Sequence, residues 1–469
     1  MEFINSSAEI NGPKILNINQ SLWDMFASAA ARHPHKEAVV SCWQKSFFED
    51  PSPTTEVTPD CARMTFGDLF ETAEALAVDL GGRGCSKGKR LLAVLDNSIE
   101  FVLLLWTAAR LRMAFVPLNP MSWNRDWDYY IRIVKPHVLV VHDEKDTEMS
   151  ASCRIPIQMH CSTANIDEWL SLPAILASLH LSIYPSFGID IEDYGGDVAL
   201  IVFTACGTSG PKGCLHTAKN IWSQSFDSDF NDNWMHTDTW LIQTPLWHMF
   251  GMNDLIRSLR YGGRVVLAAR SFDAVASLQA LIREECTRTS VFPPMVQALL
   301  EVIPYSLELP KLNRVTILGP TITTQDVKMC GKICDGMVLS AYGLSEGAPI
   351  TAWRPRESLN RNQYYTGVGK VVLGCSVKIC PADSTKALSW GEKGELHVSG
   401  SSIIDGYLDD DVEEDCFYHE NGRTWVRTRE QGFIDVDDIL YITDRVGEYI
   451  CHADIEEFIQ VSAGIKVCF

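Results

Sequence analysis

The sequence predicts an α/β fold, because two patterns together account for most of the chain. Short apolar runs alternate with amphipathic segments up to about residue 364. This alternation is typical of a mostly parallel sheet that helices cover on both faces, a doubly wound arrangement. From about residue 365 the pattern changes to short strands separated by glycines, which predicts a small β-barrel. A chain of 469 residues is too long for one small core, so several subdomains are expected.

The first helices are indicated by their caps and their apolar faces. Ser21 and Asp24 have the spacing of a capping box, and apolar residues recur at helical spacing after them. A second helix is expected to begin at Thr65 and to end at Gly81-Gly82. The segments that follow are the strand RLLAVLD, the helix SIEFVLLLWTAARLR, the strand AFVPL, the helix RDWDYYIRIV and the strand HVLVVHD.

Residues 145–190 are less periodic and are expected to form a connecting segment. The alternation then resumes with VALIVF, a helix after Thr217, WLIQT, RVVLAA, FDAVASLQALIRE, TSVFP, PMVQALLEVI, RVTILG and MVLSAYG, and the later strands are GCSVKIC, GELHVSG and ILYIT. The predicted division is an α/β subdomain over 1–190, a second one over 191–364, a β-barrel over 365–445 and a remnant over 446–469. Two such α/β subdomains predict two doubly wound sheets.

The composition argues against several classes of partner and site. A formal net charge of -20 argues against nucleic acid, whose phosphates favour clustered Lys and Arg. The 15 cysteines are scattered singly, and Cys330 and Cys334 lack the spacing of a zinc ribbon, so buried free thiols are expected. The N-terminus has no signal-peptide core, and FVLLLWTAA is too short for a membrane span. The expected compartment is the reducing cytoplasm.

Two glycine-rich stretches carry the functional signal, FTACGTSGPKGC at 203–214 and AYGLSEGAP at 341–349. The first is not a standard P-loop, since Lys212 is followed by Gly213 and not by the Ser or Thr that the P-loop requires. The second contains the G-x-S-x-G pattern of a serine hydrolase, with Ser345 as nucleophile. The prolines after it disfavour the helix that such an elbow needs, and the downstream histidines His397, His419 and His452 have no supporting local pattern.

Taken together, the two stretches resemble the adenylate-forming enzymes, the superfamily of acyl- and aryl-CoA synthetases, luciferases and peptide-synthetase adenylation domains. FTACGTSGPKGC resembles their Thr-Ser-Gly-Thr-Thr-Gly-x-Pro-Lys-Gly signature, and AYGLSEGAP resembles their Tyr-Gly-x-Thr-Glu motif. RTWVRTREQGFIDVDDILYITDR resembles their Gly-Trp-x-x-Thr-Gly-Asp segment and hinge arginine. Softer matches in the expected order include TPLWHMFGMND, ILGP, TGVGKVVLGCSVKI, GEKGELHVSG and DGYL.

The resemblance implies that the protein activates a carboxylic acid with ATP and Mg²⁺ and passes the acyl group to the thiol of CoA or of a carrier-bound pantetheine. Such an enzyme brings two anions together, so positioning and charge stabilisation are expected to supply most of its catalysis. Lipid or secondary metabolism is the expected setting. The apolar segments ALLEVI and the one around Trp247 mildly favour an apolar acyl pocket. The preferred substrate is therefore an aliphatic or aromatic acid.

The same resemblance assigns roles to individual residues. The loop from Thr204 to Gly213 is expected to hold the triphosphate, with Lys212 adding positive charge. Glu346 is expected to bind Mg²⁺, a hard cation that prefers oxygen ligands, and Ser345 keeps a hydroxyl that can contact the α-phosphate. The other expected positions are Gly207, Thr208, Ser209 and Gly210 in the loop, Gly319, Tyr342 and Gly343 at adenine, Glu430 and Arg445 at the ribose, and His248 at the mouth of the acyl pocket, with Lys212, Glu346, Ser345 and His248 as the catalytic set.

The chain departs from the family pattern at three places. An ungapped alignment puts Ala205, Cys206 and Ser209 where the family has Ser, Gly and Gly, whereas one insertion and one deletion restore GTSG at 207–210. Glu430 replaces a family aspartate. After Arg445 the family has a glycine loop and a small C-terminal domain with a late lysine, and neither has a counterpart here.

The expectation from this last departure is a largely absent C-terminal domain, with thioester formation more affected than adenylation. A partner that supplies the missing half is one reading. The ligase is the leading hypothesis, and a pseudo-enzyme that binds nucleotide or acyl acid without completing the reaction is the alternative.

Overall fold

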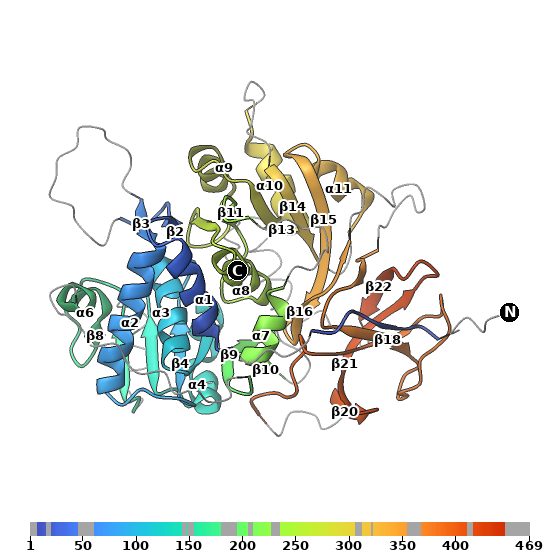
Figure 1. The fold of residues 1–469 in the computed structure, drawn as a ribbon, viewed down its shortest axis with the longest axis horizontal. Helices are drawn as coiled ribbons and strands as arrows, with labels where there is room; N and C mark the ends of the chain where they lie inside the picture. Colours follow the sequence, from blue (N-terminus) through green and yellow to red (C-terminus); the bar gives the residue numbers. More distant parts are fainter. Residues whose placement is uncertain are drawn as a thin grey trace.

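The structure is a computed structural model in which three sheets and their helices are packed together (Figure 1). It describes residues 7–15, 20–45, 61–142, 147, 154–179, 195–204, 210–226, 235–304, 312–319, 322–353, 367–409 and 416–445. For residues 353, 444 and 445 the backbone alone is described.

The first sheet has seven strands in the order β10-β9-β5-β4-β6-β7-β8, and its strands are parallel except for the edge strand β10. Its central strands are short and buried on both faces, as expected for a doubly covered parallel sheet. The strands are β4 (Arg90–Val94), β5 (Ala114–Leu118), β6 (Val138–Val141), β7 (Ile157–His160), β8 (Leu170–Ser171), β9 (Val198–Phe203) and β10 (Gly213–Thr217).

The second sheet has nine strands in the order β17-β16-β15-β14-β13-β11-β12-β2-β3. The strands from β15 to β2 are parallel, and the outer strands at each edge are antiparallel. They are β2 (Glu37–Ser41), β3 (Ala62–Thr65), β11 (Thr239–Ile242), β12 (Arg264–Leu267), β13 (Arg288–Val291), β14 (Leu312–Leu318), β15 (Cys334–Leu344), β16 (Gly347–Trp353) and β17 (Lys370–Val371).

The third sheet has six strands and is antiparallel throughout. Its long strand β21 pairs with β20 through its first part and with β22 through its last part. The strands are β1 (Glu9–Asn11), β18 (Ser376–Cys380), β19 (Gly394–Ser399), β20 (Phe417–Glu420), β21 (Arg423–Ile434) and β22 (Leu440–Arg445).

Helices cover both faces of the two parallel sheets, so the predicted α/β class is confirmed. One apolar cluster joins α1, α2, α3 and α8 to residues of both parallel sheets. A second cluster packs α9, α10 and α11 on the far face of the nine-stranded sheet. A third packs α4 on the far face of the seven-stranded sheet. The described helices are α1 (Leu22–Arg32), α2 (Phe66–Gly82), α3 (Ile99–Arg110), α4 (Pro120–Val134), α6 (Leu172–Leu179), α7 (Ala218–Gln224), α8 (Met249–Arg260), α9 (Ala274–Arg283), α10 (Pro293–Val302) and α11 (Thr324–Cys330).

The predicted capping box is present at α1, where Ser21 and Asp24 bond reciprocally. Thr65 and Asp68 form another at α2, where the second helix was expected to begin. These caps satisfy backbone N–H groups that would otherwise lack a partner at the helix starts.

Two regions differ from the sequence-based expectation. The segment expected to be a connection, 145–190, contributes β7, β8 and α6 to the first sheet. The sheets also take strands from both sides of the boundary expected near residue 190, because β2 and β3 join the second sheet whereas β9 and β10 join the first. Sequence order cannot reveal this exchange, since it depends on pairings between strands far apart in the chain, β9 with β5 and β2 with β12.

Each described cysteine is a free thiol. Among the described helices, none is long and apolar enough to cross a membrane.

Candidate active site

The glycine-rich loop connects two antiparallel strands of the first sheet. Strand β9 ends at Phe203, and Gly213 pairs with it as the first residue of β10. The ends of the loop are closed by two hydrogen bonds, from Thr204 N to Lys212 O at 2.8 Å and from Lys212 N to Thr204 Oγ1 at 3.0 Å. A P-loop leads from a strand into a helix, so this strand–loop–strand arrangement is a different construction.

The central part of the loop, including Gly207, Thr208 and Ser209, lies outside the described residues. Gly210 is described and has a φ of +88°, a conformation that favours glycine. Gly213 lies directly against the segment that follows the third sheet's β19, since a Cβ there would come within 2.9 Å of the Leu408 Cβ. The two alignments of residues 204–210 stay open.

Lys212 and Glu346 come from different sheets and meet at Tyr407. The Tyr407 hydroxyl donates a hydrogen bond of 2.6 Å to Glu346 Oε1. The Lys212 Nζ lies 5.3 Å from the centre of the Tyr407 ring and 3.6 Å from the Cys416 Sγ. A carboxylate and an ammonium group therefore lie close together around a buried tyrosine. A site that binds a metal ion and phosphate oxygens requires such a pair, since the carboxylate can bind the cation and the ammonium group can bind the phosphate.

Burial and the nearby Glu346 carboxylate raise the pKa of Tyr407, so its hydroxyl stays a hydrogen-bond donor. The sequence comparison included this residue within DGYL without assigning it a role. Backbone bonds hold the segment in place, from Leu215 N to Gly406 O at 3.2 Å and from Ile404 N to Glu346 O at 3.0 Å. All three sheets thus meet at this point.

Ser345 and Glu346 form the turn of a tight hairpin, because Leu344 of β15 pairs with Gly347 of β16. A nucleophile elbow needs a helix after the serine, whereas a strand follows here, so the local structure of a serine hydrolase is absent from this hairpin. The buried His216 of β10 donates from Nε2 to the Ser345 carbonyl oxygen at 2.7 Å and accepts at Nδ1 from Gln224 at 3.2 Å. His216 therefore positions the turn relative to the first sheet, a role that the sequence pattern did not indicate.

Burial lowers the pKa of His216 to about 4, from an ordinary 6.5. Between these values the unfolded chain binds a proton that the folded protein excludes, so lowering the pH destabilises the fold. We expect the unfolding free energy of the wild type to fall by about 2 kcal/mol more than that of His216→Gln between pH 7 and pH 5. Urea unfolding at each pH measures this difference. The exposed His35→Gln should follow the wild type, and identical curves for wild type and His216→Gln would contradict the prediction.

Tyr342 and Glu430 are brought together, since the Tyr342 hydroxyl donates a hydrogen bond to Glu430 Oε2. Tyr342 is buried in the apolar cluster of the third sheet, with 1% of its surface exposed. Glu430 pairs through its backbone with Arg445 across β21 and β22, and the Arg445 side chain lies outside the described residues. The predicted adenine and ribose positions are thus neighbours, and their roles stay a prediction.

Gly319 directly follows β14 and has a φ of +136° and open space around its Cβ position. Gly343 is different, because a Cβ there would come within 2.5 Å of the Ala348 Cβ in the facing strand. The close approach of β15 and β16 therefore requires glycine at 343.

We expect Gly343→Ala to lower the unfolding free energy by about 1–3 kcal/mol, because the added methyl group has to push the two strands apart. The midpoint of urea unfolding measures this change. Gly406→Ala is the matched control, since nothing lies within 4 Å of its Cβ position, and it should stay within about 0.5 kcal/mol of the wild type. Equal midpoints for both variants would contradict the argument.

His248 caps α8, with its Nδ1 accepting from Phe250 N at 3.3 Å. Its ring stacks on Phe250, with centroids 5.6 Å apart, and meets Phe292 edge-on at 6.2 Å. Burial lowers the pKa of His248 to about 4, so the ring is neutral near pH 7. The ring of His248, which the sequence placed at the mouth of the acyl pocket, is therefore packed and uncharged. It stacks on Phe250, which lines a pocket beside α8.

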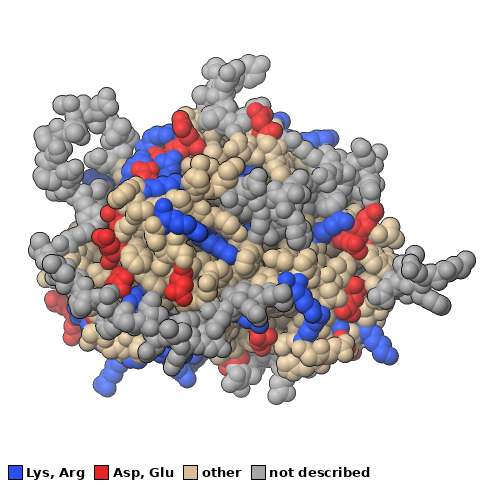
Figure 2. All heavy atoms as spheres, in the orientation of Figure 1, with Lys and Arg blue, Asp and Glu red and all other residues tan. Residues whose placement is uncertain are grey.

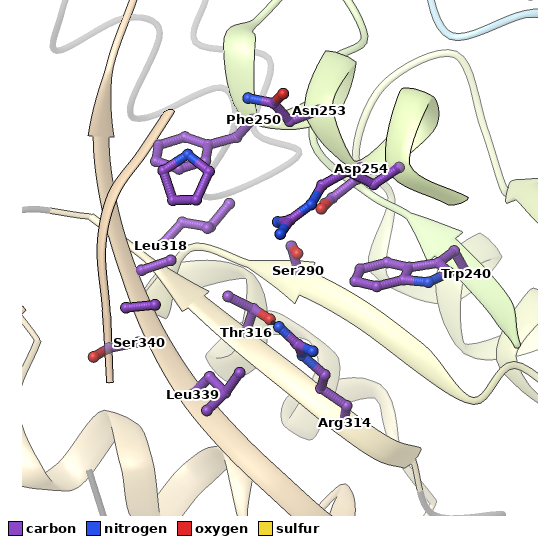
Figure 3. A pocket seen from close by; sticks show the side chains of 14 residues that line it. Trp240, Phe250, Asn253, Asp254, Ser290, Arg314, Thr316, Leu318, Leu339 and Ser340 are labelled. Carbon is purple, nitrogen blue, oxygen red and sulfur yellow. Dashed lines mark hydrogen bonds between the residues drawn. The ribbon is translucent and has the colours of Figure 1, made fainter. Parts of the chain in front are cut away.

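A narrow pocket, partly open to solvent, lies between α8 and the nine-stranded sheet. Figure 3 shows Asp254 on the side of α8 and Ser290, Thr316 and Arg314 on the side of the sheet. Phe250 and Pro349 line the same pocket, and Asn253 Nδ2 donates to Ala348 O at 2.7 Å. The pocket therefore adjoins the hairpin that carries Glu346. Its lining combines apolar with charged side chains, and the preference for an apolar acyl pocket stays a prediction.

The surface in Figure 2 has acidic and basic side chains of the described residues interspersed on the face shown. The expected remnant over 446–469, which includes His452, lies outside the described residues.

Comparison with known proteins gives consistent matches. The family described as AMP-binding enzyme matches residues 26–408. The acyl-CoA ligase SID4 of Ajellomyces capsulatus is 26% identical over 490 aligned residues, covering 96% of this chain and 78% of its own. A long-chain-fatty-acid-CoA ligase of Archaeoglobus fulgidus has a similar fold, with a TM-score of 0.77, 21% identity and coverage of 93% of this chain and 86% of its own. The O-succinylbenzoate CoA synthetase of Bacillus subtilis, solved with ATP and magnesium ion, gives a TM-score of 0.71 at 22% identity, with coverage of 91% and 80% respectively.

Proposed function

The chain belongs to the AMP-binding enzyme family and is an adenylate-forming enzyme of the acyl-CoA ligase type, and we propose that the cluster of Lys212, Tyr407 and Glu346 is its reaction centre. The reaction begins when a carboxylate oxygen of the acid attacks the α-phosphate of ATP. A new C–O–P bond forms, the bond to the β-phosphate breaks, and pyrophosphate leaves. A thiolate of CoA or of a pantetheine arm then attacks the acyl carbon, and AMP leaves.

The observation that carries the proposal is the meeting of two charged side chains at the buried Tyr407, with Glu346 at its hydroxyl and Lys212 over its ring. In the proposed complex, Lys212 stabilises the charge on the triphosphate, and the Glu346 carboxylate holds Mg²⁺. The donor set fits such an ion, because carboxylate and phosphate oxygens are the ligands that Mg²⁺ prefers. Bound there, the ion neutralises phosphate charge.

The other residues are proposed to position the substrates. Glu430, oriented by the Tyr342 hydroxyl, is placed to bind the ribose, and Gly319 leaves open space at the end of β14. The longer glutamate replaces the family aspartate and reaches the Tyr342 hydroxyl. The Ser345 hydroxyl is proposed to contact the α-phosphate, and His248 to border the acyl pocket.

The proposed compartment is the cytoplasm, in keeping with the free thiols of the described cysteines. A carrier protein stays an alternative source of the acceptor thiol.

Acid-dependent exchange of labelled pyrophosphate into ATP tests the proposal, since exchange requires reversible formation of the acyl-adenylate. We expect exchange with at least one member of a panel of short, long, aromatic and dicarboxylic acids, and none without acid or without Mg²⁺. ATP binding without exchange for every acid would contradict the ligase and indicate the pseudo-enzyme.

A further inference from the structure

Two cysteines face each other where the edge strand of the nine-stranded sheet begins. Cys42 directly follows β2, and Cys61 directly precedes β3. Ser41 lies opposite Ala62 in the antiparallel pairing of these strands, so the two cysteines occupy the next pair of opposite positions. Cys42 N donates to Leu267 O of β12 at 2.8 Å, so its backbone N–H is directed away from β3. Opposite residues that do not exchange backbone hydrogen bonds hold their side chains closest together.

The two thiols are close enough to react with each other. Their sulfur atoms and a carboxylate oxygen of Glu284 all lie within 4.8 Å of one another, and Cys61 Sγ lies 3.9 Å from Cys42 O. Opposite residues of antiparallel strands have Cα atoms about 4.5–5.5 Å apart, which is within the range of about 4.4–6.8 Å found in disulfides. Rotation of the two side chains can therefore join the sulfur atoms without separating the strands.

A positive charge lies at one of the two sulfur atoms. The Arg283 guanidinium group donates to Cys61 Sγ, where it is placed to stabilise negative charge on that sulfur. Burial and the neighbouring Cys61 thiol raise the pKa of Cys42 to about 11, so Cys42 is a protonated thiol near pH 7. The two thiols are thus unequal, with Cys61 as the nucleophile and Cys42 as the thiol that reacts second.

The surroundings of Glu284 favour sulfur chemistry over a metal ion. The Glu284 carboxylate accepts from Arg63 at 2.7 and 3.1 Å, from Arg283 at 3.0 Å and from Arg264 at 3.4 Å. Three guanidinium groups therefore surround the carboxylate of this cluster. A divalent cation would add to the positive charge and would have to displace an arginine from its only oxygen ligand, whereas a thiolate is stabilised there.

We propose that Cys42 and Cys61 are a peroxide-sensitive dithiol that forms a reversible disulfide. The Cys61 thiolate attacks hydrogen peroxide, the O–O bond breaks, and a sulfenic acid forms on Cys61 as hydroxide leaves and takes up a proton. The Cys42 sulfur then attacks the Cys61 sulfur, and the sulfenic hydroxyl leaves with the Cys42 proton as water. Two sulfur atoms are oxidised and one peroxide becomes two waters. A dithiol reductant reverses the bond by thiol–disulfide exchange.

The dithiol is separate from the proposed reaction centre. Four strands, β12, β11, β13 and β14, lie between β2 and β15 in the sheet, which places about 24 Å between β2 and the strand that leads to Glu346. The disulfide would tie the edge strand β3 to β2 and restrict the unfolded chain. Oxidation should therefore raise the thermal midpoint of unfolding by a few degrees.

Peptide mapping of the full chain without reductant tests the proposal. Trypsin places Cys42 in the peptide 37–45 and Cys61 in the peptide 46–63, each with a single cysteine. After treatment with hydrogen peroxide and alkylation, we expect these two peptides to be linked, at their summed mass less two hydrogens, and to separate with dithiothreitol. Cys286, in the peptide 284–288, is the internal control, because burial raises the pKa of its thiol and it should stay reduced. Free thiols at Cys42 and Cys61 under conditions that already oxidise Cys286 would overturn the proposal.

Three variants separate the roles within the cluster. Cys42→Ser should leave a sulfenic acid on Cys61, which dimedone traps, and should abolish the linked peptides. Arg283→Met should slow disulfide formation by about 10-fold, because it removes a charged hydrogen bond to the reacting sulfur. Arg63→Met is its matched control, since Arg63 binds Glu284 in the same cluster, and it should slow the reaction less.

Equal slowing in the two arginine variants would contradict the role of Arg283 at Cys61. Zinc analysis of the reduced protein decides the competing assignment. A zinc ion that the wild type retains in equal amount to the chain, and that Cys42→Ser loses, would identify a metal site and overturn the dithiol.

Discussion

Glu346→Gln is expected to lower the rate of acyl-adenylate formation by about 10²–10³-fold, the loss typical of removing one preorganised charged group from a reaction centre. Glutamine keeps the size of the side chain and an oxygen that can accept from the Tyr407 hydroxyl, which now lies 2.6 Å from Glu346 Oε1. The variant thus removes the negative charge and little else. The rate of pyrophosphate exchange at saturating ATP, measured over a range of Mg²⁺ concentrations, should show both a lower maximum and a higher Mg²⁺ requirement.

Tyr407→Phe is the matched control for this change. It removes the hydrogen bond to Glu346 and leaves the carboxylate charge in place, so its expected loss is smaller, about 10-fold. A Mg²⁺ requirement equal to that of the wild type in Glu346→Gln would contradict the assignment of Glu346 to the metal ion. A larger loss in Tyr407→Phe than in Glu346→Gln would mean that the tyrosine, and not the carboxylate, carries the main role.

The helices and strands with regular patterns could be predicted from the sequence. Ser21 caps α1 as its capping pattern predicted, and Thr65 caps α2 where that helix was expected to begin. Capping depends on contacts within one turn. The strands β4, β5 and β9 are apolar runs buried on both faces, which composition alone reveals.

Helix α8 did not stand out as a helix in the sequence, because its buried face carries polar residues. Its buried face includes Asn253, Asp254 and Arg257, so the apolar periodicity that identifies a helix is interrupted where the pocket is formed. The same three polar residues that obscure the helix give the pocket its character. Local sequence rules thus fail at a position where polar side chains are buried on a helix.

The candidate site was predictable in part. Lys212 and Glu346 lie in recognisable motifs, and the structure brings them to one tyrosine. His216 and the role of Tyr407 could not be predicted, because each acts through a contact between segments more than 60 residues apart or on different sheets. Single-sequence patterns report neighbours within one element, whereas these contacts depend on how three sheets meet.

The second large effect is expected for Lys212→Met, which should lower kcat/KM for ATP by about 10²-fold. The Lys212 Nζ lies over the Tyr407 ring, with 5.3 Å between the Nζ and the ring centre, at the end of the loop proposed to hold the triphosphate. Methionine retains the apolar stem of the side chain and removes the charge. The exposed Lys219→Met, seven residues further along the chain, is the matched control and should leave exchange at the wild-type rate. Equal activity of both variants would contradict a role for Lys212 in binding phosphate.

A double-mutant cycle with Glu346→Gln then tests whether the two charges act on one ligand. Groups that share a partner are coupled by about 0.5–3 kcal/mol, whereas independent sites add. Since Lys212 and Glu346 both contact Tyr407 and are both proposed to face the triphosphate, the double variant should lose clearly less activity than the product of the two single losses. Strict additivity would mean that the two residues act at separate places, and a single reaction centre at the junction of the three sheets would then be wrong.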